Sequence, residues 1–350
     1  MTVSCAVSID VSVIIPCRNE RSTIEQVLAD INAQTYHGSM EVVVADGCSD
    51  DGTREALDAA VLSSRYRFQL HVITNERRVI PSALNRAVEQ AVGRVIVRVD
   101  GHSRIPPNYV AEIAAALDSG LADVVGPRVS FIPGSMSPVA YAISTLHSSM
   151  FGTGGTPSRR ELTRPVRVAH AVMSCYHRSV WERIGGYDEA LLTNEDFDFD
   201  YRATQAGATV VALPSPEFQL MARSTLRGLI SQRWRYGWWK AAVIRKHPAS
   251  LHLRQVLPVA ALLALITLIG MSFFGAEYII ALVAVIYGYV GIGSCAALLA
   301  LMPNVLSDSS PDGKKILTTV LLAPLIFAII HGVWAAGVVS GLIAGRKAGR

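Results

Sequence analysis

EVVVADGCSDDGT, residues 41–53, decides the fold class, because a short β-branched run leads directly into a loop rich in turn residues. Runs of the same kind lie on either side of it in the chain: VSVIIP at residues 11–16, HVIT at residues 71–74 and RVIVRV at residues 94–99. Near-continuous apolar strands that alternate with helix-like segments are typical of parallel sheets, which are buried on both faces. The sequence therefore predicts an α/β fold with a mostly parallel sheet.

Polar residues collect where the predicted strands end. Pro16 and Arg18 follow the first strand, Asp46 follows the second, and Asp100 follows the last. In open parallel sheets the ligand binds at the carboxyl ends of the strands. A carboxylate such as Asp46 can accept hydrogen bonds from a base or a ribose there, although the same run is also a good turn and helix-cap sequence. We interpret this edge as a nucleotide site.

Asp100 and His102 flank a glycine at the end of the last predicted strand and form a candidate metal pair. Mn²⁺ and Mg²⁺ take carboxylate oxygens readily, and imidazole is more acceptable to Mn²⁺. A cation bound here would neutralise the charge that develops on a leaving diphosphate. The alternative is an Asp-Gly turn with a bystander histidine.

An acidic stretch at residues 194–200, NEDFDFD, carries four carboxylates within six residues: Glu195, Asp196, Asp198 and Asp200. Acidic residues in the first turn of a helix often only complement the helix dipole. Four carboxylates exceed what capping needs, so we interpret one of them as the general base that takes a proton from an acceptor hydroxyl. Their spacing does not choose among them.

The C-terminal part of the chain is much more apolar than the rest. Hydrophobic residues make up 51% of the sequence and the mean hydropathy is +0.34, which is too high for an ordinary soluble enzyme. Three long apolar segments cover about residues 256–274, 277–302 and 316–344. At about 1.5 Å per residue, a helix of about 19 residues spans nearly the whole bilayer core of about 30 Å. We expect these segments to cross a membrane.

A basic and aromatic segment at residues 223–254 precedes the apolar segments. Basic residues beside membrane spans favour the cytoplasmic side, and aromatic residues are common at the membrane interface. We expect a catalytic domain over residues 1–222, this juxtamembrane segment, and a transmembrane domain over residues 255–350. The protein is expected to be a multi-pass protein of the cell (inner) membrane with a cytoplasmic catalytic domain, although three spans would place the basic tail at residues 346–350 outside.

Five segments in this order resemble family-2 inverting glycosyltransferases with the GT-A fold and cover roughly residues 10–240: SVIIPCRNE, VVVADGCSDDGT, VRVDGH, GGYDEALLTNEDFDFDYR and QRWRYGWW. Within that family, N-E-R-R-x-I-P-x-A-L-N, V-D-G-H, F-G-T-G-G and G-W-W are similar to the ExoA-type glucosyltransferases of succinoglycan assembly. The resemblance implies a UDP-sugar donor, with UDP-glucose as the expected one, and a divalent metal, Mn²⁺ or Mg²⁺. It also implies a polyprenyl-diphosphate-linked oligosaccharide acceptor; we expect no nucleic-acid partner.

The resemblance further implies roles for individual residues. The donor would be held by Pro16, Arg18, Glu20, Asp46, Arg78 and Asp100, with Asp46 at the uracil and Arg78 at the diphosphate. Asp100 and His102 would bind the metal, and Asp196, next to Glu195, would be the base. The residues expected at the acceptor are Gly154, Gly155, Gln232, Arg235, Tyr236 and Trp238.

The chain departs from the family pattern at two places. The usual D-x-D is D-x-H here, because His102 stands at its third position, and this leaves the identity of the metal open. Gln232 and Arg235 match the Q-x-x-R-W signature of processive synthases, but Tyr236 stands in place of its tryptophan. This second departure weakens the interpretation as a processive polysaccharide synthase.

Three other interpretations remain open from the sequence. A polyprenyl-phosphate glycosyltransferase would share the same kind of catalytic domain and membrane segments. A dinucleotide-binding oxidoreductase would need G-x-G-x-x-G after the first strand, whereas the glycines at 152, 154 and 155 are followed by Pro157 at the final position. A non-catalytic membrane scaffold could also keep this fold.

Overall fold

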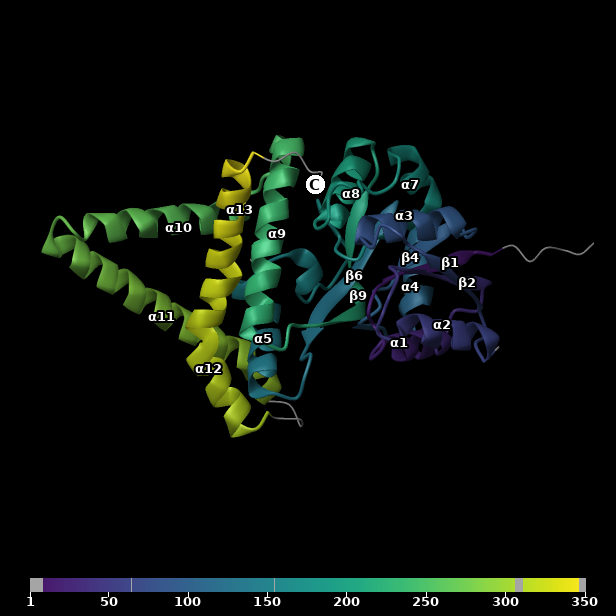
Figure 1. Cartoon of the computed structure of the whole chain (residues 1–350), viewed down its shortest axis with the longest axis horizontal. Coiled ribbons are helices and arrows are strands. Elements are labelled where there is room, and N and C mark those ends of the chain that lie inside the picture. Colours follow the sequence, from purple (N-terminus) through teal and green to yellow (C-terminus); the bar gives the residue numbers. More distant parts are fainter. Residues whose placement is uncertain (1–8, 64, 154, 306–310, 346–350) are drawn as a thin grey trace, which may run out of the picture. The chain divides into compact units, whose positions relative to one another are not determined.

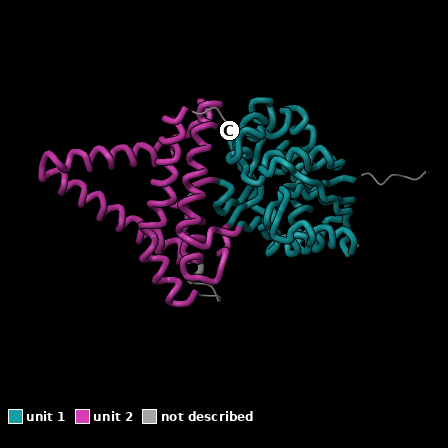
Figure 2. The backbone as a smooth tube through the Cα atoms, viewed as in Figure 1, with its two compact units in different colours: residues 1–130, 157–220 teal, residues 131–156, 221–350 magenta. Residues whose placement is uncertain are grey.

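The computed structural model describes residues 9–63, 65–153, 155–305 and 311–345. The chain forms two compact units, which Figure 2 shows in different colours. The first unit combines residues 1–130 with 157–220, and the second combines residues 131–156 with 221–350. Residues 131–156, which lie inside the expected catalytic range, therefore make most of their contacts with the C-terminal helices.

A mixed sheet forms the centre of the first unit, with the strand order β3-β2-β1-β4-β8-β6-β9-β5 and with β7 paired to β9. The strands are β1 (Val11–Cys17), β2 (Met40–Asp46), β3 (Gln69–Thr74), β4 (Val95–Arg98), β5 (Ser103–Arg104), β6 (Val124–Ile132), β7 (Val166–Arg167), β8 (Cys175–His177) and β9 (Val210–Met221). The four strands predicted from the sequence, β1 to β4, pair in parallel. Strand β8 pairs antiparallel with both β4 and β6, which makes the sheet mixed.

Helices cover both faces of this sheet, as Figure 1 shows. They are α1 (Ile24–Asn32), α2 (Thr53–Leu62), α3 (Ile80–Gln90), α4 (Tyr109–Asp118), α7 (Arg178–Ile184) and α8 (Glu195–Gln205). Alternate residues of a strand point to opposite faces. Val13 and Ile15 accordingly pack in the core with α1, α2 and α4, whereas Ile14 packs with α3, α7 and α8. This two-sided burial explains the uninterrupted apolar strands and confirms the predicted α/β fold.

The second unit consists of helices. They are α5 (Pro138–Ser148), α6 (Met150–Thr153), α9 (Leu226–Lys246), α10 (Leu253–Met271), α11 (Ala276–Val305), α12 (Gly313–Ala328), a π-helical turn η3 (Ile329–Val333) and α13 (Trp334–Ile343). Two short 3₁₀ turns, η1 (Pro157–Arg159) in the first unit and η2 (Pro248–Ser250) in the second, complete the helical segments of the described chain. The acceptor-side residues predicted on the Q-R-W-R-Y-G-W-W run therefore lie on α9.

Three helices are long and apolar enough to cross a membrane: Leu253–Met271, Ala276–Pro303 and Gly313–Ile343. They match the three predicted apolar segments, and the third runs through α12, η3 and α13 without a break. In the first two, 0% and 6% of the residues of the apolar stretch are buried by the rest of the protein. An exposed apolar surface of this extent marks an interaction with another apolar phase, and lipid suits helices of this length.

Helices α9 and α13 approach each other through glycines. A Cβ atom on Gly337 would lie 2.5 Å from the carbonyl oxygen of Trp234, and one on Gly237 would overlap the carbonyl oxygen of Trp334. Gly341 is equally close to Ala241 and Trp238. Small residues allow this backbone approach between helices in membrane proteins. The run around Gly237 predicts an interfacial motif and carries no local signal of this packing role.

Candidate active site

Two of the residues predicted to bind the sugar donor lie at the carboxyl ends of adjacent strands. Pro16 and Asp46 close β1 and β2, whose last paired residues are Cys17 and Asp46. The backbone NH of Gly47 donates to the carbonyl of Cys17 at 2.7 Å, which joins the two strand ends. The side chain of Asp46 is 2% exposed and accepts a hydrogen bond from the hydroxyl of Ser49 at 2.5 Å. The carboxylate is therefore held in one orientation at the sheet edge.

The two arginines predicted to bind the sugar donor contact each other beside these strand ends. The guanidinium of Arg18 donates to the carbonyl oxygen of Arg78 at 3.5 Å, although the two residues follow different strands, β1 and β3. The side chain of Arg18 also covers Gly47, where a Cβ atom would lie 3.1 Å from it. Both arginines are exposed, and two positive charges on the loops at this edge suit an anionic ligand such as a diphosphate.

The loops that follow β1, β2 and β3 each contain a non-glycine residue with positive φ: Asn19 at 57°, Cys48 at 53° and Arg78 at 58°. Such residues are uncommon, and their strain persists only where surrounding contacts hold it. The backbone NH of Asn19 donates to the hydroxyl of Ser49 at 2.9 Å, and its side-chain amide donates to Asp50 at 2.9 Å. The loops that line the edge are thus tied to one another.

Glu20 contacts His102, which the sequence analysis did not foresee. Nδ1 of His102 lies 2.8 Å from Oε1 of Glu20, and the hydroxyl of Thr23 donates to the carbonyl of Gly101 at 2.7 Å. A carboxylate beside Nδ1 favours the tautomer with the proton on Nδ1, so Nε2 carries the lone pair. Carboxylates hold metal-binding histidines in this way in many proteins.

Asp100 and His102 lie in the turn between β4 and β5 and supply one carboxylate and one imidazole. Among the described residues there is no group of three or more His, Cys, Asp or Glu side chains that could enclose a metal ion. Mg²⁺-type cations that act on phosphates are commonly held by only one or two protein side chains, with phosphate oxygens and water completing the shell. The carboxylate and the imidazole therefore fit a cation whose other ligands come from a diphosphate, and Mn²⁺ suits the imidazole.

Arg98 is a buried cation that the sequence analysis missed. Its side chain is 5% exposed; Nε donates to Asp100 at 3.0 Å and Nη1 donates to Glu195 at 3.4 Å. Burial raises the pKa of Glu195 to about 7, and the neighbouring charge of Asp196 adds to the effect, while Arg98 opposes it. Arg98 thereby ties the end of β4 to the start of α8, and its only sequence signal was an arginine inside an apolar strand.

The four carboxylates of the acidic stretch fall into different environments in α8. Asp198 is fully buried and binds Arg202 at 2.7 Å, and Arg202 also donates to the carbonyls of Ile184, at the end of α7, and Gly186, just after it. Asp200 is fully buried and accepts from the hydroxyl of Ser174 at 2.7 Å and the NH of Ala171 at 2.8 Å. Both carboxylates are therefore structural.

The remaining two carboxylates differ in accessibility. The side chain of Glu195 is 7% exposed and is held by Arg98. The side chain of Asp196 is 25% exposed, which makes it the most accessible carboxylate of the stretch. Asn194, in front of them, has a positive φ of 64°, so the chain turns sharply into the helix here. Asp196 is consequently the carboxylate of this group that is most open to solvent.

The predicted acceptor residues lie in the second unit, and Gly154 is outside the described residues. Gln232, Arg235 and Tyr236 are three and four positions apart on α9, so they share one face of the helix. The backbone of Trp238 lies instead against Gly337 and Gly341. Gly155 has a φ of 69°, which a side chain would disfavour.

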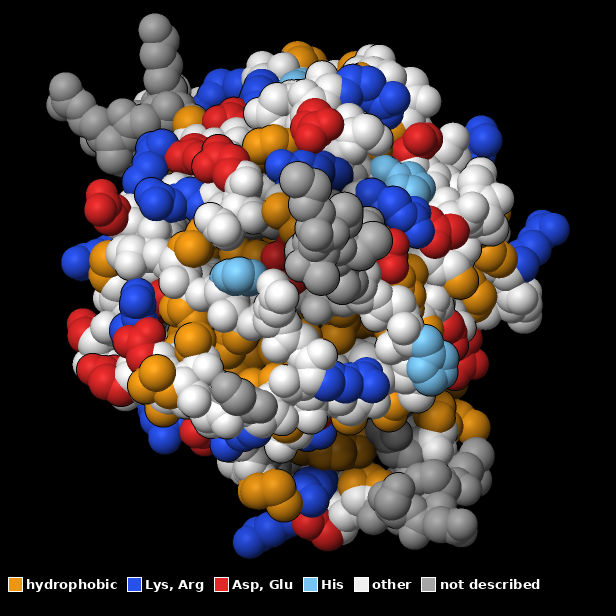
Figure 3. Space-filling view, turned by 90° about the vertical axis from the view of Figure 1, so that its right-hand side faces the viewer, with side chains coloured by type: hydrophobic (Ala, Val, Ile, Leu, Met, Phe, Trp, Pro, Cys, Tyr) orange, Lys and Arg blue, Asp and Glu red, His pale blue; other side chains and the backbone are white. Residues whose placement is uncertain are grey.

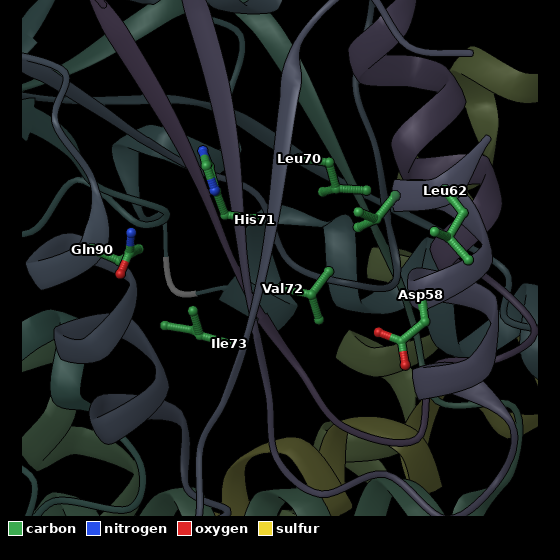
Figure 4. A pocket seen from close by; sticks show the side chains of 8 residues that line it. Asp58, Leu62, Leu70, His71, Val72, Ile73 and Gln90 are labelled. Atoms are coloured by element: carbon green, nitrogen blue, oxygen red, sulfur yellow. The ribbon is translucent and has the colours of Figure 1, made fainter. Parts of the chain in front are cut away.

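A hollow of about 450 Å³ lies on the edge strand β3 of the first unit. Figure 4 shows that Leu70, His71, Val72 and Ile73 of the strand line it between Leu62 and Gln90. None of the predicted site residues lines this hollow, so we assign it no role.

Figure 3 shows one face of the molecule, on which basic and acidic side chains are interspersed, as expected of a water-exposed surface.

Comparisons with known proteins agree with this geometry. The chain resembles a solved mannosyltransferase, PcManGT from Pyrobaculum calidifontis in complex with GDP-Man and Mn²⁺, with a TM-score of 0.57, 20% identity, and coverage of 97% of this chain and 91% of that one. This likeness shows the nucleotide-sugar glycosyltransferase fold of the GT-A type, followed here by apolar helices.

Sequence comparisons define the family. The model for glycosyl transferase family 2 matches residues 12–185. The succinoglycan biosynthesis protein ExoA of Rhizobium meliloti (strain 1021) is 30% identical over 334 residues, which are 93% of this chain and 92% of that protein. Glycosyltransferase AglE of Haloferax volcanii is 28% identical over 198 residues, which are 56% of this chain and 62% of AglE. The chain belongs to glycosyl transferase family 2, which confirms the resemblance found in the sequence.

Proposed function

We propose that this glycosyltransferase transfers a single sugar, with inversion, from a UDP-sugar to a polyprenyl-diphosphate-linked oligosaccharide. The expected donor is UDP-glucose, and the reaction would serve exopolysaccharide or cell-envelope glycan assembly. The observation that carries the proposal is the Arg98 bridge, because one guanidinium joins the donor-side Asp100 to Glu195, directly beside the accessible Asp196. The similarity to ExoA over almost the whole chain supports the choice of acceptor class.

The donor would lie along the edge formed by β1, β2 and β4. Asp46 would accept a hydrogen bond from the uracil, with Pro16 and Glu20 bordering the nucleotide, while Arg18 and Arg78 would face the diphosphate. A divalent cation at Asp100 and His102 would neutralise charge on the departing diphosphate. Hydrogen bonds between the loops after β1 and β2 already hold their backbone in place, so little reorganisation of these loops is needed when the donor binds.

The transfer step needs one base. The carboxylate of Asp196 takes the proton of the acceptor hydroxyl while the hydroxyl oxygen forms a bond to the anomeric carbon of the donor. The bond between that carbon and the diphosphate oxygen breaks, and its electron pair leaves with UDP. Attack and departure occur on opposite faces of the sugar, so the anomeric configuration is inverted.

The helices that could cross a membrane would anchor the enzyme next to its lipid-linked acceptor. We infer a multi-pass protein of the inner membrane with the catalytic unit on the cytoplasmic side, because the basic helix α9 precedes the first apolar helix. On α9, Gln232, Arg235 and Tyr236 would meet the acceptor.

Two acceptors should be compared directly, because a dolichol-phosphate mannosyltransferase of Pyrococcus furiosus is also similar, with 30% identity over 159 residues that make up 45% of this chain and 44% of that protein. The full chain in detergent would receive radiolabelled UDP-glucose and Mn²⁺ with either polyprenyl phosphate or a polyprenyl-diphosphate-linked saccharide. We expect label only on the lipid-linked saccharide, with one sugar added per acceptor. Label on polyprenyl phosphate, or a ladder of longer products, would contradict the proposal.

A further inference from the structure

His170 lies between two carboxylates of α8. Its Nδ1 is 2.8 Å from Oδ2 of Asp200, and its Nε2 is 3.7 Å from Oδ2 of Asp196. The histidine comes from the loop between β7 and β8, and its side chain is 16% exposed. The ring of Phe197 packs edge-on against it, with the ring centroids 5.5 Å apart. The imidazole is thus clamped with one nitrogen toward each carboxylate.

Asp200 fixes the orientation of this ring. Its buried carboxylate also accepts from the hydroxyl of Ser174 and the backbone NH of Ala171, so it has several donors and a defined position. An ionised carboxylate only accepts hydrogen bonds, so Nδ1 of His170 must carry a proton and donate it. Nε2 therefore points at Asp196 in either charge state of the ring.

Asp196 is held from two sides. Its Oδ1 accepts from the backbone NH of Phe197 at 2.7 Å, and its Oδ2 faces Nε2 of His170. A neutral ring would place the lone pair of Nε2 against a carboxylate, which is unfavourable. A protonated ring instead places an N–H there, which stabilises the ionised carboxylate and restrains its rotation.

We propose that His170 is a positioning residue for sugar transfer, which is anchored on Asp200 and keeps the carboxylate of Asp196 ionised and oriented toward the acceptor. This inference rests on the proposed role of Asp196 as the base. It adds a residue that the five motif segments of the sequence do not contain.

The charges around the pair agree with this assignment. Burial lowers the pKa of His170, but the charges of Asp196 and Asp200 outweigh it, so the pKa is raised above its ordinary value even with Arg159 nearby. Burial raises the pKa of Asp196, but His170 and then Arg98 outweigh it, so that pKa is lowered. Arg159 also lowers the pKa of Asp196, and burial and the charge of Asp196 in turn raise the pKa of the neighbouring Glu195. Each member of the pair therefore favours the charged form of the other.

The coupling between His170 and Asp196 predicts the direction in which the pH dependence of transfer shifts when His170 is replaced. As the pH is lowered, the rate of transfer falls where the base becomes protonated, and this part of the pH profile is its acidic limb. Without the imidazolium the pKa of Asp196 rises, so this acidic limb moves to higher pH. A role of His170 in folding alone would lower the amount of active enzyme at every pH and would leave the position of the limb unchanged.

Two substitutions separate the contacts of the ring. In His170→Asn the amide nitrogen can replace Nδ1 as donor to Asp200, but nothing replaces Nε2. In His170→Gln the longer side chain can place a neutral donor near Asp196. With UDP-glucose, Mn²⁺ and a polyprenyl-diphosphate-linked saccharide, and with UDP release as the readout, we expect both variants to shift the acidic limb upward by about one pH unit, the size typical of a nearby opposite charge. We expect His170→Gln to retain more of the maximal rate.

A second measurement follows the histidine itself in the full chain. With ¹³C-labelled histidine in detergent, the signal lost in His170→Asn identifies the ring, and its titration gives the pKa. Asp196→Asn should lower the pKa of His170 by about one unit, because the facing negative charge is removed.

The outcomes distinguish this proposal from the proposed function. An unshifted acidic limb in His170→Asn, or an unchanged His170 titration in Asp196→Asn, would overturn the role of His170 even if Asp196→Asn is inactive. If Asp196→Asn transferred sugar at the full rate, the role of Asp196 as the general base would be refuted instead. A shift in both measurements together with an inactive Asp196→Asn supports both.

Discussion

Asp196→Asn is expected to reduce sugar transfer by a factor of about 10² to 10⁴, the usual contribution of a general base. An amide has nearly the shape of a carboxylate but cannot take the proton of the acceptor hydroxyl. The residues proposed to bind the donor follow β1, β2, β3 and β4, whereas Asp196 is on α8, so donor binding should change little. The measurement is the initial rate of UDP release with acceptor, together with the affinity for UDP by calorimetry.

A matched control is Glu182→Gln, which removes a carboxylate of the same unit that is 56% exposed and lies on α7. It should leave both the rate and the UDP affinity close to those of the wild-type protein, since exposed ion pairs contribute little. Comparable rates for Asp196→Asn and wild type would refute the base assignment. A parallel loss of UDP affinity would mean that Asp196 acts in donor binding.

Arg98→Met is expected to give the largest loss of stability. Methionine fills much of the same volume, but it leaves the carboxylate of Glu195 buried beside Asp196 without its cation. Removing one partner of a buried ion pair costs about 3–5 kcal/mol. For a unit of this size that corresponds to a fall in melting temperature of about 6–20 °C, which differential scanning fluorimetry on the full chain in detergent can follow.

Glu195→Gln provides the matched test of this explanation. Added to Arg98→Met, it removes the uncompensated charge, so the double variant should recover part of the lost melting temperature. Burial raises the pKa of Glu195 to about 7, so the penalty should be smaller near about pH 5, where the folded protein keeps that carboxyl protonated. If Glu195→Gln lowered the stability of Arg98→Met further, the bridge would not be the reason for the loss.

The strands, and the helices that are long and apolar enough to cross a membrane, could be predicted because their signals are local. The apolar runs that end at Pro16 and Asp46 have a composition that only a doubly covered strand explains, and the structure places them side by side at one edge. The three apolar segments exceed the length of a buried soluble helix. In each case the information lies within about 20 neighbouring residues.

Contacts between distant residues could not be predicted in this way. Arg98 and Glu195 are 97 positions apart, and His170 and Asp200 come from a loop and a helix with β8 and α7 between them. The choice among the acids also depends on tertiary burial, because Asp198 and Asp200 differ from Asp196 only in what covers them. The positive φ of Arg78 is equally invisible, since arginine rarely adopts it.

The anomeric configuration of the product tests the central claim most directly. The donor UDP-glucose is α-linked, and the full chain would receive it labelled with ¹³C at the anomeric carbon, with Mn²⁺ and a polyprenyl-diphosphate-linked saccharide. Single displacement with Asp196 as base predicts one β-linked glucose, recognised by the large proton coupling at the anomeric position in the NMR spectrum of the released saccharide. An α-linked product would contradict the account, because retention requires a different mechanism and a different role for Asp196.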